Sequence, residues 1–117
     1  MGFSQGATLC GIALATPGIG ERFSFGILVS GMKSRATQTE GLDYGAILVP
    51  TLHVIGLNDR VLPVRLSEGL YEAMTGSPKM LAKHARGHVV PELDENGAPI
   101  LEKFLAERRR GGLSSTL

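Results

Sequence analysis

The sequence contains a single cysteine, Cys10, among its 117 residues. One cysteine cannot form an internal disulfide or a structural zinc cluster, and a reducing compartment is the default expectation. Its neighbours, ATLCGIA, predict a small buried hydrophobic side chain rather than a reactive thiol. The histidines lack the paired spacing of metal ligands, so we expect neither a metal nor any other cofactor.

Long hydrophobic runs and an excess of charge of one sign are also missing. No apolar stretch approaches the roughly 20 residues that a membrane helix needs, and no basic region followed by an apolar stretch opens the chain. The net charge of +1 gives no bulk attraction to nucleic acid or anionic lipid. No G-x-x-x-x-G-K-S/T phosphate loop occurs. We therefore expect a cytoplasmic protein without a nucleic-acid or membrane partner.

The composition that is present is typical of one globular domain. Hydrophobic residues make up 43% and charged residues 20%, which excludes a disordered chain. Apolar runs of strand length alternate with helical patterns. The strands are predicted over 23–30, 51–56 and 80–84, and the helices over 5–16, 64–74 and 99–109. Residues 31–48 predict a long loop or a short helix plus a loop. Gly111–Gly112 predict a helix stop, and residues 111–117 a disordered tail.

This order of elements predicts an α/β fold with about three parallel strands joined by right-handed crossovers. In a parallel sheet, functional loops follow the carboxyl ends of the strands. That rule selects residues 30–34, 57–63 and 85–91. We expect a site where these loops meet the amino end of the first helix.

The motif G-x-S-x-G occupies residues 2–6, directly before the first predicted helix. In a nucleophile elbow, a sharp strand-to-helix turn lifts the serine oxygen clear of the sheet, and Gly2 and Gly6 would leave room where side chains clash. The backbone N–H of Gln5 would then help to stabilise an oxyanion. The alternative is an ordinary serine N-cap between flexible glycines, and the motif alone does not separate the two.

If Ser4 is a nucleophile, a histidine must accept its proton and a carboxylate must orient that histidine. His88, in ARGHVVP, follows the third predicted strand and is the candidate base. His53 lies inside a predicted strand and His84 closes one, so both are predicted to be packed or capped.

The candidate acid is Asp59, in GLNDRVLP, because it directly follows the second predicted strand. Its alternative is a turn residue paired with Arg60. Asp43 lies in the long loop, and Asp94 is interpreted as a capping or solvated residue near the last helix. The order Ser4, Asp59, His88 is the order of a triad built on an α/β-hydrolase sheet.

Three segments together resemble the serine hydrolase family that is widespread in fungi and has a human ovarian-tumour-suppressor relative. They are GFSQGA at 2–7, PTLHVIGLNDRVLP at 50–63 and GHVVP at 87–91, and the resemblance runs from Gly2 to about Leu105. It implies the α/β-hydrolase fold, with Ser4 as nucleophile, Asp59 as acid and His88 as base. It also implies a small-molecule ester or thioester as substrate.

The family fold would place several strands and helices before the nucleophile, whereas only Met1 precedes Gly2 here. We therefore expect residues 1–110 to be the C-terminal part of a hydrolase domain without its N-terminal strands. A truncated product, an internal start codon or a split chain would each give this result. The elbow would lack its leading strand, and the second oxyanion N–H would have no source, which costs about a hundred- to a thousand-fold in turnover. We predict a serine esterase or thioesterase that is weak or inactive as the isolated chain.

The alternative function is a non-catalytic hydrolase remnant. Without the leading strand, the sheet would present an open apolar edge, and that edge could pair with a second copy or with a separate N-terminal half. An obligate dimer would favour this interpretation, whereas a monomer with esterase activity would count against it.

Overall fold

The computed structural model describes residues 1–91 and 98–116. Within these residues the chain forms one parallel sheet in the order β1-β2-β3-β4. The strands are β1 (Gly2–Phe3), β2 (Gly26–Val29), β3 (Thr51–Gly56) and β4 (Lys79–His84). The helices are α1 (Gln5–Ala15), α2 (Val64–Ala73) and α3 (Ala98–Thr116), with short 3-10 turns at Gly20–Arg22, Thr37–Thr39 and Tyr44–Ala46. The predicted parallel α/β class is confirmed.

The sheet has one strand more than predicted because the residues before the elbow pair with β2. Gly2 lies opposite Leu28 and Phe3 opposite Val29. The Ser4 N–H continues this ladder and donates to the Val29 carbonyl at 2.8 Å. The expectation of an elbow without a leading strand is therefore wrong: β1 leads into the turn and ties it to the sheet. A two-residue strand is too short to produce a hydrophobic period in the sequence.

One edge of the described sheet is consequently β1 rather than β2. The pairing of this edge with a second chain stays a prediction.

Helix α3 extends beyond its predicted end. We predicted a stop at Gly111–Gly112 and a disordered tail, but the helix continues to Thr116. Each glycine costs about 1 kcal/mol relative to alanine in a helix, yet it keeps its backbone N–H and interrupts no hydrogen bond. Residues 92–97, which include Asp94, lie outside the described residues, as does Leu117.

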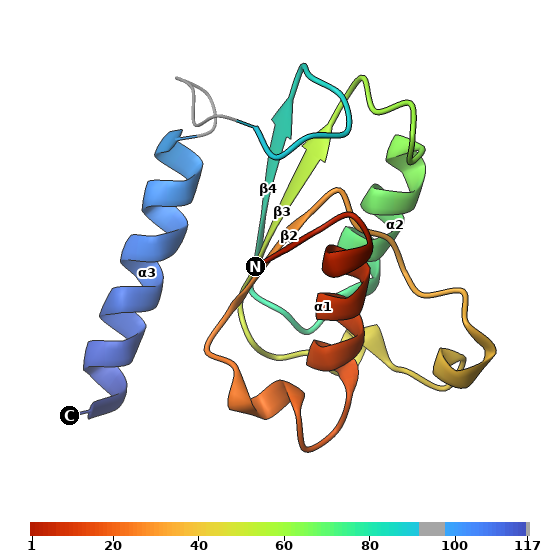
Figure 1. Cartoon of the computed structure of the whole chain (residues 1–117). Coiled ribbons are helices and arrows are strands. Elements are labelled where there is room, and N and C mark those ends of the chain that lie inside the picture. Colours follow the sequence, from red (N-terminus) through yellow and green to blue (C-terminus); the bar gives the residue numbers. More distant parts are fainter. Residues whose placement is uncertain (92–97, 117) are drawn as a thin grey trace.

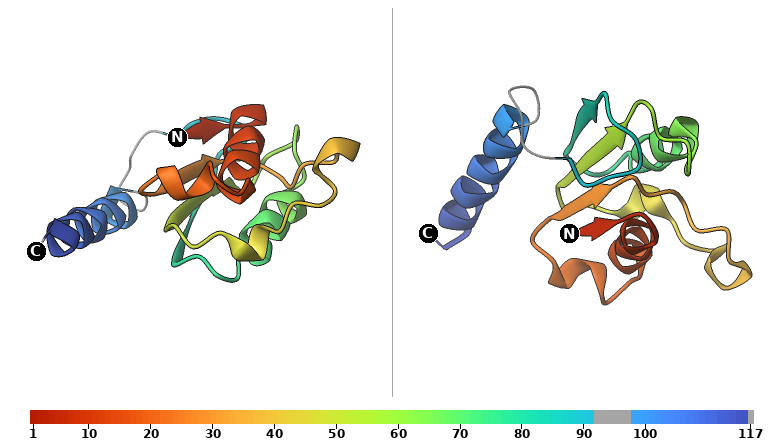
Figure 2. Two further views of the ribbon diagram at one scale, coloured as in Figure 1. Left: turned by 90° about the horizontal axis from the view of Figure 1, so that it is seen from below. Right: turned by 45° about the horizontal axis from the view of Figure 1, so that its top comes forward.

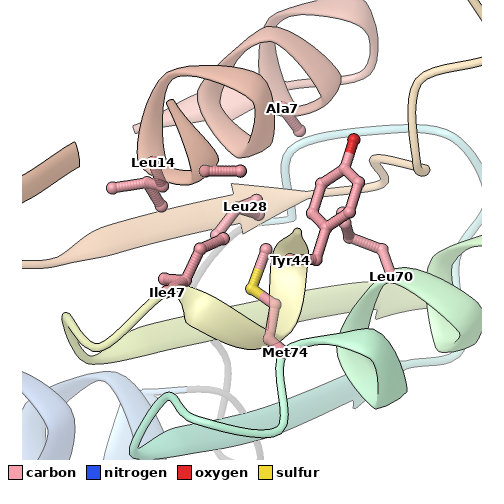
Figure 3. Packing of buried hydrophobic residues seen from close by; sticks show 8 residues of the cluster. Ala7, Leu14, Leu28, Tyr44, Ile47, Leu70 and Met74 are labelled. Atoms are coloured by element: carbon pink, nitrogen blue, oxygen red, sulfur yellow. The ribbon is translucent and has the colours of Figure 1, made fainter. Parts of the chain in front are cut away.

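Helices cover both faces of the sheet (Figures 1 and 2). Between the sheet and helices α1 and α2 lies the larger apolar cluster (Figure 3), which contains Ala7, Leu14, Ala15, Leu28, Tyr44, Ile47, Leu70 and Met74. On the α3 side, Phe104 packs against Leu52 and Ala82. Adjacent residues of β2, Ile27 and Leu28, belong to opposite clusters. Burial on both faces is what a parallel sheet requires, and it explains the unbroken apolar runs.

All four strands run in the same direction, so their carboxyl ends meet at one end of the sheet, at the top of Figure 1. Helix α1 begins at this end, directly after β1. The segments that follow β3 and β4 carry Asp59 and His88. The topology therefore brings the three predicted residues to one place, although 84 positions separate Ser4 from His88.

Candidate active site

Ser4, His88 and Asp59 form a continuous hydrogen-bonded chain. His88 Nε2 lies 2.7 Å from Ser4 Oγ, and His88 Nδ1 lies 2.7 Å from Asp59 Oδ2. The His88 and Asp59 side chains are 14% and 4% exposed, so both contacts are largely shielded from water. In this arrangement the imidazole can accept the serine proton while the carboxylate holds the other ring nitrogen.

Ser4 occupies a strained turn. Its φ of 58° and ψ of −119° lie outside the regions that residues with side chains normally adopt. Such a conformation costs on the order of 1–3 kcal/mol and persists where the surrounding structure enforces it. Ser4 makes no side-chain hydrogen bond to the first turn of α1. Its hydroxyl faces His88 instead, so the ordinary N-cap interpretation is wrong.

The two glycines of the motif play different steric roles. A Cβ added to Gly2 would lie closer than 3.0 Å to the backbone of Gly6 and Ala7, so the turn leaves no room for a side chain there. A Cβ added to Gly6 would meet nothing within 4 Å. The prediction that a side chain would clash is therefore correct for Gly2 and wrong for Gly6. The backbone of Gly6 is instead one of the groups that would clash with a side chain at Gly2.

The backbone N–H of Gln5 lies at the start of α1, directly after Ser4. Helix α1 begins at Gln5, and the Thr8 N–H is bonded to the Ser4 carbonyl at 3.0 Å. Amides in a first helical turn have no acceptor within their own helix, and the helix dipole makes this end partially positive. The Gln5 N–H can therefore donate to negative charge that develops beside Ser4.

Asp59 is held by the backbone on its other side. Its Oδ1 accepts from the N–H groups of Val61 and Leu62 at 2.9 and 2.8 Å. Burial by itself would raise the pKa of this carboxyl, but the bonds from Leu62, His88 and Val61 and the attraction of His88 together lower it below its usual value. The alternative pairing with Arg60 is absent from the described ion pairs, so Asp59 is present as a carboxylate directed at His88.

Asn58 joins the loops that carry Asp59 and His88. Its N–H donates to the Arg86 carbonyl at 3.1 Å, and its side-chain amide donates to the Ala85 carbonyl. A Cβ on Gly56 would approach the carbonyl oxygens of Arg86 and Gly87 closer than 3.0 Å, so the loops are also packed tightly. In the sequence Asn58 indicates only a turn, because its partners lie 27 and 28 residues away.

A pocket of about 110 Å³ opens beside the Ser4–His88–Asp59 hydrogen bonds. It is lined by Ser4, Gln5, Thr8, Ser30, Met32, Val61, Leu62 and His88. The ring of Phe3 also packs against His88, with ring centroids 4.9 Å apart. Ser30 belongs to the predicted loop 30–34, whereas Phe3 and Thr8 were missed by sequence reasoning because neither has a reactive side chain at a recognisable spacing.

The other histidine and aspartate candidates take no part in the Ser4–His88–Asp59 hydrogen bonds. His84 Nδ1 accepts from the Arg86 N–H at 3.2 Å, and Asp43 Oδ1 accepts from the Gly45 N–H at 2.9 Å, which caps a 3-10 turn. In the part of the chain that the structure describes, no group of three or more His, Cys, Asp or Glu side chains is arranged to hold a metal ion.

His53 is a packed core residue, as predicted. It is 2% exposed, its Nε2 lies 3.0 Å from Thr51 Oγ1, and its ring meets the Tyr71 ring edge-on at 5.2 Å. Burial, with a smaller contribution from the charge of Lys79, lowers the pKa of His53 from 6.5 to about 4. The native protein therefore keeps this imidazole neutral at pH values where an unfolded chain protonates it.

This difference predicts a loss of stability in mild acid. The contribution of His53 is fully present above pH 6.5, falls as the pH drops toward 4, and is constant below that value. The total is roughly 3 kcal/mol, at about 1.4 kcal/mol per pH unit. Urea unfolding measured at several pH values in this window checks the expectation. His53→Gln, which keeps a hydrogen-bonding group toward Thr51, should lose clearly less stability over the same window. An equal loss in both proteins would contradict the assignment.

Residues 1–100 match the family model described as Serine hydrolase (FSH1). The chain belongs to this serine hydrolase family. The predicted resemblance to a serine hydrolase family is thus confirmed.

No helix within residues 1–91 and 98–116 is long and apolar enough to cross a membrane.

The chain is similar to several curated members. It is 39% identical over 94 residues to "Esterase OVCA2" of Xenopus tropicalis, covering 78% of this chain and 40% of that protein. It is 37% identical over 98 residues to "Esterase OVCA2" of Danio rerio, covering 78% and 41%. Against "Family of serine hydrolases 2" of Saccharomyces cerevisiae, it is 36% identical over 101 residues, covering 78% and 45%. The matched part therefore spans less than half of each relative.

A solved structure supports the fold alone. The crystal structure of Atu2452, a protein of unknown function from Agrobacterium tumefaciens, matches with a TM-score of 0.63 and 23% identity, covering 92% of this chain and 50% of that one.

Proposed function

We propose that this chain carries the catalytic triad of a serine esterase or thioesterase, with Ser4 as nucleophile, His88 as base and Asp59 as the orienting acid. The observation that carries the proposal is the pair of 2.7 Å contacts that link Ser4 Oγ through His88 to Asp59 Oδ2. The strained elbow at Ser4 and the esterase names of the relatives support it.

In the first half of the reaction, Ser4 Oγ attacks the carbonyl carbon of the substrate while His88 Nε2 accepts the hydroxyl proton. The carbonyl oxygen becomes an oxyanion, which the Gln5 N–H stabilises. As the tetrahedral intermediate collapses, the bond to the leaving alcohol or thiol breaks, and His88 returns the proton to it. An acyl group remains bound to Ser4 Oγ.

In the second half, water takes the place of the alcohol or thiol. His88 Nε2 accepts a proton from water, which attacks the acyl carbon, and the same proton then returns to Ser4 Oγ as the carboxylic acid leaves. Asp59 holds the protonated imidazole in both halves by accepting the Nδ1–H bond at Oδ2 and stays ionised throughout.

Fluorophosphonate labelling tests the proposal directly. These probes react appreciably only with a serine that its base activates. We expect the purified chain to be labelled, and labelling to disappear in Ser4→Ala and His88→Ala. Ser24→Ala removes an exposed hydroxyl outside the site and should be labelled like the wild type.

Circular dichroism of each variant separates lost chemistry from lost folding. A folded wild-type chain that is not labelled, or labelling that survives in Ser4→Ala, would contradict the proposal.

A further inference from the structure

A larger groove adjoins the catalytic pocket and runs along α1. Its volume is about 410 Å³, and it shares Gln5, Thr8 and Met32 with the smaller pocket. Leu9 and Ile12 continue its wall on the same face of the helix. From Gln5 to Ile12 this face extends about 10 Å at the rise of an α-helix. The groove therefore leads away from Ser4 over the length of a medium aliphatic chain.

The opposite wall is a segment that the fold holds in place. The Gly31 carbonyl accepts from Ser67 Oγ at 2.6 Å, and the Met32 N–H donates to Thr8 Oγ1 at 3.2 Å. The Ser34 N–H donates at 3.0 Å to the hydroxyl of Tyr44, which leaves the apolar cluster at the tip of its ring (Figure 3). Residues 31, 32 and 34 are thus anchored to three different elements, so the groove has a built wall rather than a loose loop.

This wall also carries positive charge, between residues 32 and 34 and directly after residue 34. Lys33 and Arg35 are exposed, and both line the groove. Neither has an ion-pair partner among the side chains that the structure describes. The Lys33 ammonium lies 6.0 Å from the Tyr44 ring centroid, a contact that favours this position without neutralising the charge. The groove thus combines apolar side chains from α1 with two cations that pair with no carboxylate of the described residues.

We propose that this groove binds the aliphatic chain of the substrate and that Lys33 and Arg35 bind an anionic group at its far end. The inference rests on the proposed function of Ser4 and adds a substrate class to it. An ester of a dicarboxylic acid, with one carboxyl esterified and the other free, has this chemistry. A thioester with phosphate on its leaving group offers the same negative charge from the other side of the scissile bond.

The proposal is tested by comparing the hydrolysis of acidic and neutral esters that have the same chain length. The substrates are p-nitrophenyl monoesters of dicarboxylic acids from adipate to sebacate and the neutral p-nitrophenyl acyl esters of equal chain length. We expect KM to be roughly ten-fold lower for one of the acidic esters than for its neutral partner, as a charge-assisted contact allows. The double variant Lys33→Gln/Arg35→Gln should abolish this difference in KM between the acidic and neutral esters. Lys103→Gln, which removes an exposed cation on α3, should preserve it.

The outcomes separate this inference from the proposed function. Hydrolysis of neutral esters with no preference for acidic ones overturns the inference and leaves the function intact. An S-acyl phosphopantetheine with a neutral acyl group, hydrolysed with the same dependence on Lys33 and Arg35, would support an anion site at these two residues and overturn its assignment to the acyl chain.

A binding measurement decides the inference even if hydrolysis is undetectable. Ser4→Ala is titrated with the monomethyl ester of azelaic acid, and backbone amide shifts are followed by NMR. We expect shifts over residues 8–12 and 32–35, and affinity at least roughly ten-fold weaker when Lys33 and Arg35 are also replaced. Equal affinity with and without the two cations, or no shifts in these segments, would overturn the inference.

Discussion

Replacing Gly2 by alanine is expected to abolish the geometry of the proposed catalytic site. The added Cβ would lie closer than 3.0 Å to backbone atoms of Gly6 and Ala7, and backbone at the start of a helix cannot move aside without breaking the turn. The elbow must open, and the 2.7 Å contact between Ser4 Oγ and His88 Nε2 is then lost. Since a displacement of about 1 Å can cost a hundred-fold in rate, we expect fluorophosphonate labelling to slow by at least roughly that factor.

Gly6→Ala is the matched control, because it adds the same methyl group to the same motif. Nothing lies within 4 Å of the new Cβ, and alanine is favoured over glycine inside a helix by about 1 kcal/mol. We expect labelling at the wild-type rate and an equal or higher urea midpoint. Similar labelling of the Gly2 and Gly6 variants would show that the turn does not depend on the close approach described above.

Asp59→Asn is expected to slow labelling by about ten-thousand-fold. The asparagine Oδ1 can still accept from the Val61 and Leu62 N–H groups, so the turn should survive. The atom facing His88 Nδ1 becomes an amide donor, however, and the imidazole must then present an acceptor to it. His88 Nε2 would carry the proton and could not accept one from Ser4.

Asp43→Asn provides the matched control for this variant. Asp43 also accepts a backbone N–H bond, from Gly45, but lies in a separate loop. It should be labelled like the wild type. Labelling rates for Asp59→Asn within a few-fold of the wild type would contradict the role of Asp59, provided that thermal unfolding shows both variants to be folded.

The local patterns of the chain were sufficient to predict much of the fold. The helices α1 and α2 begin where predicted and end only one residue before their predicted ends. The prediction is this close because apolar spacing and the Pro17–Gly18 pair are properties of residues that are neighbours in the sequence. Strands β3 and β4 were found from short apolar runs for the same reason. The predicted strand boundaries were wrong where pairing with a distant strand sets the length of a strand. β2 is shorter than the apolar run that contains it, and β1 exists only through its pairing with β2.

The sequence by itself also determined which residues are candidates for the site. A parallel sheet brings strand carboxyl ends together, so a serine before a helix and an aspartate and a histidine after strands are expected to meet. The residue types and the order of the strands are therefore enough to predict that these three residues meet, without knowledge of any distance between them.

Only the tertiary structure decided how these residues are held and what lies beside them. Ser4 Oγ contacts His88 rather than the first turn of α1, and Asp59 contacts His88 rather than Arg60. Both contacts depend on a loop that lies 84 residues from Ser4 and 29 residues from Asp59 along the chain. The link through Asn58, the open space at Gly6 and the groove between α1 and Lys33 arise in the same way. Each depends on the separation in space of groups far apart along the chain, and side-chain packing sets that separation.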